Sequence, residues 1–323
     1  MSLWRAALFV AFAAFVTTRS SQASEPWPTR NVTVVVPFGP SGAADGAARL
    51  FADRLSKRWG RAVVVENRPG AEAILGTGAF VRAQDDHALL YSAASVLTVT
   101  PLVQDNLPFD ASRDFVPISA TCSAVFVLAI NKDVHAAALN DLVRIAKAEP
   151  GKLLWSSAPG LPRYAFAAFL KQQGIDMVYV PYRDVAIPQA DLGEGRLHVL
   201  LTTQHAVIAP VQSGKASIIA VTNKQRGPLL SQVPTVGEAG FAELTVDGLS
   251  GFFGPRGMPA SLQEKIAADV KAVADEPELR SRIEALGQQI IGSTPGEFVA
   301  AIDEQRGRVE AVARIINLKA AGQ

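Results

Sequence analysis

Short apolar runs alternate with amphipathic segments along most of the chain. Mostly apolar runs, typical of strands buried on both faces of a parallel sheet, occupy residues 32–36, 62–66 and 88–92. Apolar residues recur at helical spacing from residue 47 to residue 55, and a further helix is expected over residues 74–83. Because short links join these elements, their order predicts right-handed parallel crossovers and an α/β fold.

The alternation returns in the middle of the chain. Strands are expected at residues 125–130, 152–156, 176–180, 198–201 and 218–221, and helices at residues 139–148 and about 164–172. Two α/β units predict a cleft between two lobes, bordered by the carboxyl ends of strands and the amino ends of helices. Such a cleft suits a receptor and an enzyme equally well.

The last third of the chain has a helical pattern. Two segments match the capping box, in which the side chains of the first and fourth residues bond each other's free backbone amides. They begin at Ser261 and Thr294 and end at Glu264 and Glu297, and Pro295 fits the first turn of the second helix. The final helix is expected to end at about Lys319.

Composition excludes several classes of function. With 323 residues, 49% hydrophobic and 19% charged, the chain is long enough for two domains with full cores. The formal net charge of +1 lacks the basic footprint that a nucleic-acid partner requires. Cys122 is the only cysteine, which excludes an internal disulfide and a cysteine zinc cluster, and its apolar surroundings predict a small core residue.

The amino terminus has the pattern of a secretory signal peptide. Arg5 precedes an apolar run at residues 6–16, and Ser21, Gln22 and Ala23 resemble a cleavage site. The run is shorter than the roughly 20 residues that a membrane-spanning helix needs. We therefore expect a signal peptide at residues 1–23 and an exported, periplasmic mature protein, with a buried amino-terminal helix as the alternative.

The stretch VVVPFGPSGAADGAARLF, residues 34–51, predicts a strand, a loop of small residues and a helix. Its glycine spacing fits neither a P-loop nor a dinucleotide fingerprint, and Ala43 stands where a nucleophile elbow needs glycine. Free amides at a helix amino end favour an anion, and Ser41, Gly42 and Ala43 let a carboxylate approach. Asp45 is expected to cap this loop. A capped turn without a ligand is the alternative.

Other candidate chemistry is weaker. The four histidines, which lack any tight metal-binding spacing, are His87, His135, His198 and His205. Asp85 and Asp86 follow a predicted helix and are expected to be surface residues. No metal, cofactor or catalytic residue is predicted.

The chain as a whole resembles the Bug-type receptors, the extracytoplasmic solute-binding proteins of tripartite tricarboxylate transporters. The motifs that carry the resemblance, in chain order, are TVVVPFGPSGAADGAARLFADRLSKRWGRAVVVENRPGA, LPFDASRDFVPIS, VPYR, VPTVGEAGF, GFFGPRGMPASLQEKI and LGQQIIGSTPGEF. The resemblance implies an α/β, two-lobed type II periplasmic binding protein fold with two crossing strands. It places lobe 1 at residues 24–122 and 248–323, and lobe 2 at residues 123–247.

The implied function is capture of a small organic carboxylate and its delivery to integral-membrane permease subunits, with no catalysis and with the receptor as a monomer. Ligand contacts implied by the resemblance lie in both lobes: Pro40, Ser41, Gly42, Ala43, Asp45, Ala71, Ser92, Ala93 and Ser95 in the first, and Ser157, Gly160, Arg163, Thr202 and Thr203 in the second. An orphan receptor that feeds a two-component system is the alternative. An exported hydrolase that uses Ser41 ranks last.

The chain departs from the family pattern mainly in lobe 2. Leu161 and Pro162 replace small hydroxyl positions, Arg163 adds a charge, and Thr202 replaces a frequent acidic residue. In lobe 1 a common Gly-Gly pair is replaced by Glu72 and Ala73. Without an acid to pair with an ammonium group, amino acids are disfavoured, and a dicarboxylate or an aromatic carboxylate is favoured. Arg163 can face the cleft and bind a second carboxylate, or lie on the surface.

Overall fold

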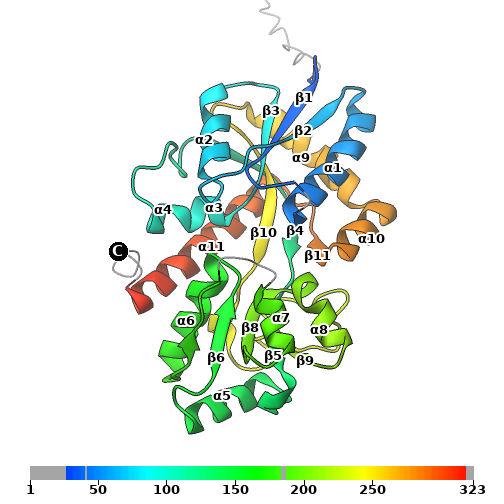
Figure 1. Cartoon of the computed structure of the whole chain (residues 1–323). Coiled ribbons are helices and arrows are strands. Elements are labelled where there is room, and N and C mark those ends of the chain that lie inside the picture. The colour runs from blue at the N-terminus through cyan, green and yellow to red at the C-terminus, as the bar shows by residue number, and fades with distance from the viewer. Residues whose placement is uncertain (1–26, 41, 183–186, 318–323) are drawn as a thin grey trace, which may run out of the picture.

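A computed structural model describes residues 27–40, 42–182 and 187–317. The chain forms two lobes, each built on one sheet with helices on both faces (Figure 1). The predicted signal peptide, Ser41 and the expected helix end at Lys319 lie outside the described residues. Within the described ranges, no helix combines the length and the apolar character needed to cross a bilayer.

Lobe 1 contains a mixed six-stranded sheet. Its strand order is β11-β4-β10-β3-β1-β2. The strands are β1 (Val32–Val36), β2 (Val63–Asn67), β3 (Ala88–Ala93), β4 (Phe115–Ala124), β10 (Gly248–Pro255) and β11 (Gln288–Ile290). β1 is parallel to β2 and β3, whereas β10 is antiparallel to β3 and β4. The expected parallel arrangement therefore holds only for β1, β2 and β3. The other half of the sheet is antiparallel, because β10 and β11 come from the last third of the chain and pair with β3 and β4.

Helices cover both faces of this sheet. One face carries α1 (Ala43–Trp59), α9 (Ala260–Ala274) and α10 (Pro277–Ala285). The other carries α2 (Ile74–Ala83), α3 (Ser95–Thr98) and the first half of α11 (Pro295–Ile316), with α4 (Thr100–Val103) beside it. Cys122 is fully buried, and its Sγ lies 3.1 Å from the Tyr91 hydroxyl. The prediction of a core cysteine is therefore confirmed, and burial raises the pKa of this thiol.

Lobe 2 contains a five-stranded sheet of order β7-β6-β8-β5-β9. The strands are β5 (Phe126–Asn131), β6 (Leu154–Ser157), β7 (Val178–Tyr179), β8 (Val199–Thr203) and β9 (Ala216–Val221). α5 (Leu139–Ala148) and α6 (Leu161–Gln173) cover one face. α7 (Ile187–Gly193), η2 (Gln204–Val207) and α8 (Ile208–Gln212) lie against the other. Two further 3-10 turns are η1 (Lys132–Val134) and η3 (Ala242–Leu244).

The chain crosses between the lobes twice along the sheets, from β4 into β5 and from residues 222–247 into β10. The Asn223 side chain joins the two crossings, because its Oδ1 accepts from the Phe126 amide at 2.9 Å and its Nδ2 donates to the Ala124 carbonyl at 2.9 Å. α11 makes a third connection. Phe298 packs in the lobe 1 core and Val309 packs in the lobe 2 core.

Most predicted elements occur within a few residues of their expected positions, but one predicted cap is wrong. The Thr294 box forms as expected: its hydroxyl accepts from the Glu297 amide, and the Glu297 carboxylate accepts from the Thr294 amide. The Ser261 box does not form. α9 begins at Ala260 with Pro259 as N-cap and no side-chain cap, which places Ser261 inside the first turn. α6 begins at Leu161, a few residues earlier than expected, because Pro162 fits the first turn of a helix.

Candidate functional site

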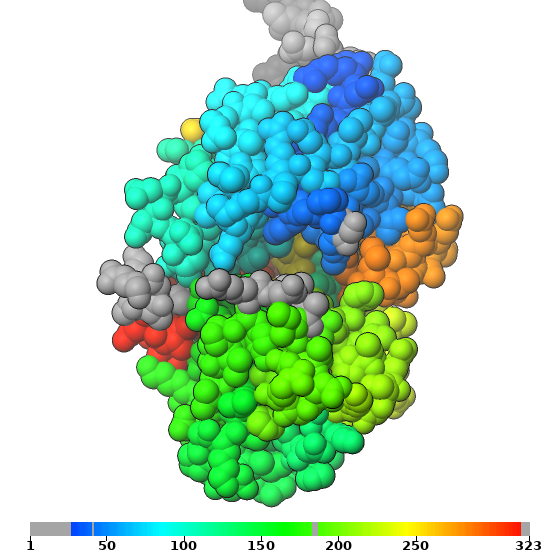
Figure 2. Space-filling view, in the orientation of Figure 1, coloured from blue at the N-terminus to red at the C-terminus, as the bar shows by residue number. Residues whose placement is uncertain are grey.

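The predicted ligand contacts of lobe 1 gather at one edge of its sheet. Because β1, β2 and β3 are parallel, the loops that follow them emerge at their common carboxyl edge. These loops and the strand and helix ends beside them contain Pro40, Gly42, Ala43, Asp45, Ala71, Ala93 and Ser95. In Figure 1, β1 runs toward lobe 2 from the side of lobe 1 where the described chain begins. Figure 2 shows that the surface is hollowed where the two lobes meet. The loops therefore face the cleft.

The amino end of α1 has the geometry of an anion cradle. Its N-cap is Gly42, which has an extended backbone and no side chain to occupy the helix end. The first amide bonded within the helix is that of Gly46, which donates to the Gly42 carbonyl at 2.9 Å. The amides before it have no acceptor within the helix, and Gly42 and Ala43 are exposed. An anion at this end would also be favoured by the helix dipole.

Asp45 fixes the base of this cradle. Its carboxylate is almost fully buried, at 3% exposure, and accepts from Arg49 Nε at 3.0 Å and from Asn67 Nδ2 at 2.8 Å. Asn67 Nδ2 also donates to the Phe38 carbonyl at 3.1 Å, so the network ties α1 and the loop after β1 to the end of β2. Arg49 and Asn67 were not among the residues expected at the site from the sequence. The i,i+4 spacing of Asp45 and Arg49 was an available signal.

Gln288 holds the same helix end from the opposite side. Its Nε2 donates to the Ala43 carbonyl at 2.8 Å, and its side chain is buried. A side chain at Gly46 would place its Cβ 3.1 Å from Leu286, so glycine lets the end of α10 approach α1 closely. The sequence gives no signal for this contact, because 245 positions separate the two partners.

The loop between β2 and α2 is strained. Three successive non-glycine residues have positive φ angles: 46° at Ala71, 52° at Glu72 and 77° at Ala73. Side chains rarely adopt this left-handed region, which glycine enters without steric cost. Ala71 and Glu72 are exposed, whereas Ala73 is buried in the lobe 1 core. The replacement of the family's Gly-Gly pair thus falls where glycine would relieve strain.

The loop after β3 presents only part of its predicted contact set. Ser92 is fully buried, and its hydroxyl donates to the Ala93 carbonyl at 3.4 Å. It therefore offers no surface to a ligand, because its strand position points it into the sheet core. Ala93 and Ser95 are half-buried, and Ser95 begins α3.

The predicted contacts of lobe 2 gather at the carboxyl edge of its own sheet, where β6 and β8 are parallel. The Ser157 hydroxyl oxygen is buried and has no hydrogen-bond partner among the described residues. Gly160 opens α6 with a positive φ, and a Cβ added there would meet no atom within 4 Å. Thr202 is 9% exposed within β8, and Thr203 is half-buried. The Ser157 hydroxyl therefore remains unbonded among the described residues, at the start of the loop that follows β6.

Arg163 lies in the first turn of α6 and is exposed. Its guanidinium carbon lies 4.7 Å from the Tyr179 ring centroid and 5.8 Å from that of Tyr164. Among the residues that the structure describes, no carboxylate forms an ion pair with it. Two aromatic rings thus hold an uncompensated cation near Gly160.

A cluster of titratable groups lies away from the cleft. Ligand atoms of Asp85, Asp86 and His87 lie within 4.8 Å of one another. Arg30 bonds both carboxylates, at 2.6 and 2.7 Å, and His87 Nε2 accepts from the Thr29 amide at 3.1 Å. Bonding to Arg30 lowers the pKa of Asp85, and bonding to His87 lowers that of Asp86. These contacts anchor the segment before β1 to the turn after α2.

A receptor family and several known proteins match this sequence over most of its length. Residues 47–318 match the family model described as "Tripartite tricarboxylate transporter family receptor". The chain is 30% identical over 304 residues to the "UPF0065 protein in tcbD-tcbE intergenic region" of Pseudomonas sp. strain P51, covering 91% of this chain and 89% of the relative. It is 27% identical to the protein BugT of Bordetella pertussis, covering 88% of this chain and 86% of BugT.

Solved structures agree in fold. "Structure of a periplasmic transporter" has a TM-score of 0.76 and 28% identity, covering 91% of this chain and 99% of the other. "R. palustris Rpa4515 with adipate" has a TM-score of 0.76 and 27% identity, covering 90% and 98%. The family match covers most of the chain, and the fold and the cleft agree with it. The chain therefore belongs to the tripartite tricarboxylate transporter receptor family and is a periplasmic solute-binding receptor of the Bug type.

Proposed function

We propose that this receptor captures a small dicarboxylate or aromatic carboxylate between its lobes and delivers it to the permease subunits of a tripartite transporter. The observation that carries the proposal is the amino end of α1, where Gly42 and Ala43 are exposed and the amides of Ala43 and Ala44 have no acceptor within the helix. The loops after β2 and β3 border the same edge of the sheet.

The opposite lobe supports the choice of ligand class. The stacked guanidinium of Arg163 can bind a second carboxylate with two parallel hydrogen bonds. Thr202 provides no charge to hold an ammonium group, which disfavours amino acids. The similarity to Rpa4515 with adipate, a molecule with a carboxylate at each end, supports the same class.

We also propose lobe boundaries, a location and a set of ligand contacts for the receptor. Lobe 1 comprises residues 24–122 and 248–323, and lobe 2 comprises residues 123–247. Residues 1–23 form a cleaved signal peptide, and the mature receptor acts as a monomer in the periplasm. Ligand contacts are Pro40, Ser41, Gly42, Ala43, Ala71, Ala93, Ser95, Ser157, Gly160, Arg163, Thr202 and Thr203, and Asp45 supports the cradle from beneath.

Isothermal titration against a panel of carboxylates, with product analysis, tests this function. Gly42→Asp is the sharpest variant, because an aspartate at an N-cap bonds the helix amides and stabilises the helix while it repels the ligand. The φ of Gly42 is negative and its Cβ would meet only the Gly39 carbonyl, at 3.6 Å, so the change fits the fold. We expect Gly42→Asp to abolish carboxylate binding without lowering Tm.

Gly42→Ser is the matched control, since it adds a neutral cap and should keep most of the affinity. Unchanged binding by Gly42→Asp would show that the ligand lies elsewhere. Loss of the titrated acid to a new product would contradict a receptor role.

A further inference from the structure

α11 packs against both lobes from behind the cleft. Its first half enters the lobe 1 core through Phe298 and Ile302, and its second half enters the lobe 2 core through Val309. Lys171 Nζ of α6 donates to the Ile315 carbonyl near the end of α11, at 2.7 Å. In Figure 1 the helix lies across the junction of the lobes. Any change in the angle between the lobes must therefore be accommodated along α11.

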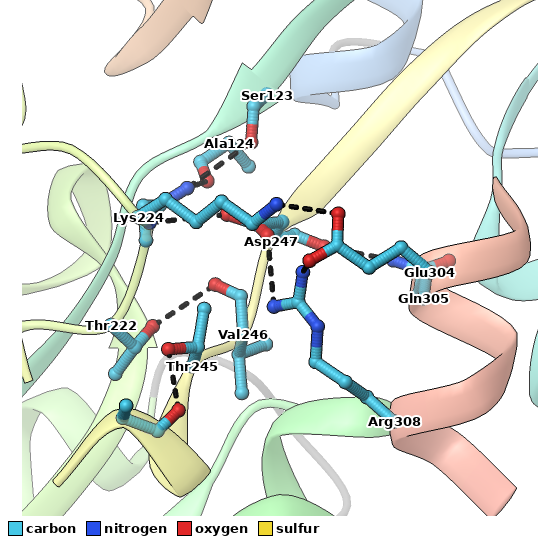
Figure 3. Close-up of polar contacts among 12 residues, drawn as sticks. Ser123, Ala124, Thr222, Lys224, Thr245, Val246, Asp247, Glu304, Gln305 and Arg308 are labelled. Atoms are coloured by element: carbon cyan, nitrogen blue, oxygen red, sulfur yellow. Dashed lines mark hydrogen bonds and ion pairs between the residues drawn. The ribbon is translucent and has the colours of Figure 1, made fainter. Parts of the chain in front are cut away.

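Gln305 lies in the middle of α11 and is 6% exposed. Its Oε1 accepts from the Thr98 hydroxyl at 2.9 Å. Its Nε2 donates to the Asp247 carbonyl at 3.1 Å, and both of these residues are labelled in Figure 3. Asp247 immediately precedes β10, at the second crossing between the lobes. The buried side-chain amide of Gln305 thus joins α3 of lobe 1 to the second crossing between the lobes, which we call the hinge.

α3 is the helix that begins at Ser95, a proposed ligand contact, and it ends at Thr98. Thr98 is 2% exposed, and the next residue, Val99, packs in the lobe 2 core. A helix of four residues has few hydrogen bonds of its own, so the orientation of Ser95 depends on what holds Thr98.

The same part of α11 also borders the ligand loop of lobe 2. A cavity of about 180 Å³ lies between parts of α6 and α11, and Leu161, Gln305 and Arg308 are among its lining residues. Leu161 is the first residue of α6, directly after Gly160. Gln305 therefore lies next to α3 of lobe 1 and also lines the cavity beside the start of α6 in lobe 2.

We propose that Gln305 is a positioning residue that fixes α3, and with it Ser95, relative to the hinge, so that the ligand site is already ordered when the ligand arrives. The proposal rests on the proposed function, because Ser95 matters only if a ligand binds in the cleft. An ordered site avoids the entropy cost of ordering during binding, so the loss of this tie weakens binding.

Thr98→Val and Thr98→Ser are the matched pair that tests it. Valine has the shape of threonine but no hydroxyl, whereas serine keeps the donor. With adipate as the probe, we expect Thr98→Val to raise Kd about fivefold and Thr98→Ser to stay within about twofold, as for one net hydrogen bond. Thr98→Val should add nothing to Gln305→Leu, because the two residues act through one bond. Hydrogen exchange without ligand should accelerate at residues 95–99 in Thr98→Val.

Several results would overturn the inference. A Kd unchanged by Thr98→Val while Tm falls means that the bond serves stability alone. Equal weakening by the valine and serine variants removes the role of the hydroxyl. If the wild-type protein binds neither adipate nor any acid of the panel, the proposed function fails. The exchange measurement still decides whether Gln305 orders α3, and unchanged exchange at residues 95–99 overturns that statement.

Discussion

The guanidinium carbon of Arg163 lies 4.7 Å from the centroid of the Tyr179 ring. Stacking on an aromatic face restricts a guanidinium while the N–H groups at its edge stay available to a carboxylate. Tyr179 ends the edge strand β7, and Arg163 belongs to the first turn of α6. The two residues together hold a positive charge beside the start of α6, at the edge of the lobe 2 sheet.

We expect Arg163→Gln to weaken dicarboxylate binding about tenfold, as for a lost charge-assisted hydrogen bond, and to change monocarboxylate binding little. Isothermal titration with adipate and a monoacid of similar length measures the difference. Arg144→Gln is the control, because Arg144 is an exposed arginine of the same lobe on α5. Stabilisation of the wild-type protein by glutamate or aspartate alone, with no response to diacids or aromatic acids, would contradict the assignment.

The two capping-box sequences should behave differently on mutation. Thr294→Ala removes a hydroxyl that bonds the Glu297 amide and should lower the free energy of unfolding by about 1 kcal/mol. Ser261→Ala should leave it within about 0.5 kcal/mol, because Ser261 is exposed and caps nothing in α9. Urea unfolding of both variants provides the comparison, and equal losses would show that Ser261 also caps its helix.

Glycine should stabilise the strained loop of lobe 1. Glu72 is exposed with a φ of 52°, so Glu72→Gly removes left-handed strain without losing packing. We expect the free energy of unfolding to rise by about 1 kcal/mol. Ala268→Gly, at an exposed position inside α9, should lower it by about 1 kcal/mol, because glycine there only weakens a helix. A loss of stability in Glu72→Gly would mean that the loop is not strained.

Glu304 should make part of the stability depend on pH. Its carboxylate accepts from Lys224 Nζ at 2.5 Å and from Arg308 Nη2 at 2.7 Å (Figure 3), and bonding to Lys224 lowers its pKa. A lowered folded-state pKa contributes stability above the usual glutamate pKa of about 4.3 and loses it as the pH falls through the folded value. The wild-type protein should therefore exceed Glu304→Gln in stability at pH 7, and the difference should shrink in acid.

The size of this difference should stay below about 1 kcal/mol, because the Glu304 side chain is 49% exposed and solvent screens the pair. Unfolding at several pH values and at low and high salt measures it. Glu310→Gln, on the same helix, is the control for loss of a surface glutamate with a weaker contact, at 3.7 Å from Arg314. A difference that grows in acid would have the wrong sign for this mechanism.

Local elements could be predicted from the sequence, whereas long-range pairings could not. The apolar run at β1 and the sequence pattern at α5 predicted their bounds, because burial on both faces of a sheet or on one face of a helix constrains neighbouring residues. No such pattern shows that Phe252 pairs with both Tyr91 and Ser119. In the site, free amides and small residues predicted the α1 cradle, but the Gln288 anchor depends on how β11 joins the sheet.

The position of β10 between β3 and β4 has a consequence for the order in which the molecule assembles. As the chain emerges from its amino end, β1, β2 and β3 appear first, but their link to β4 is missing until residue 255 is available. All five strands of lobe 2 are complete by Val221. Lobe 2 can therefore close its sheet first, and lobe 1 starts earliest yet finishes last. The cleft between the lobes can therefore form only after most of the chain has been synthesised.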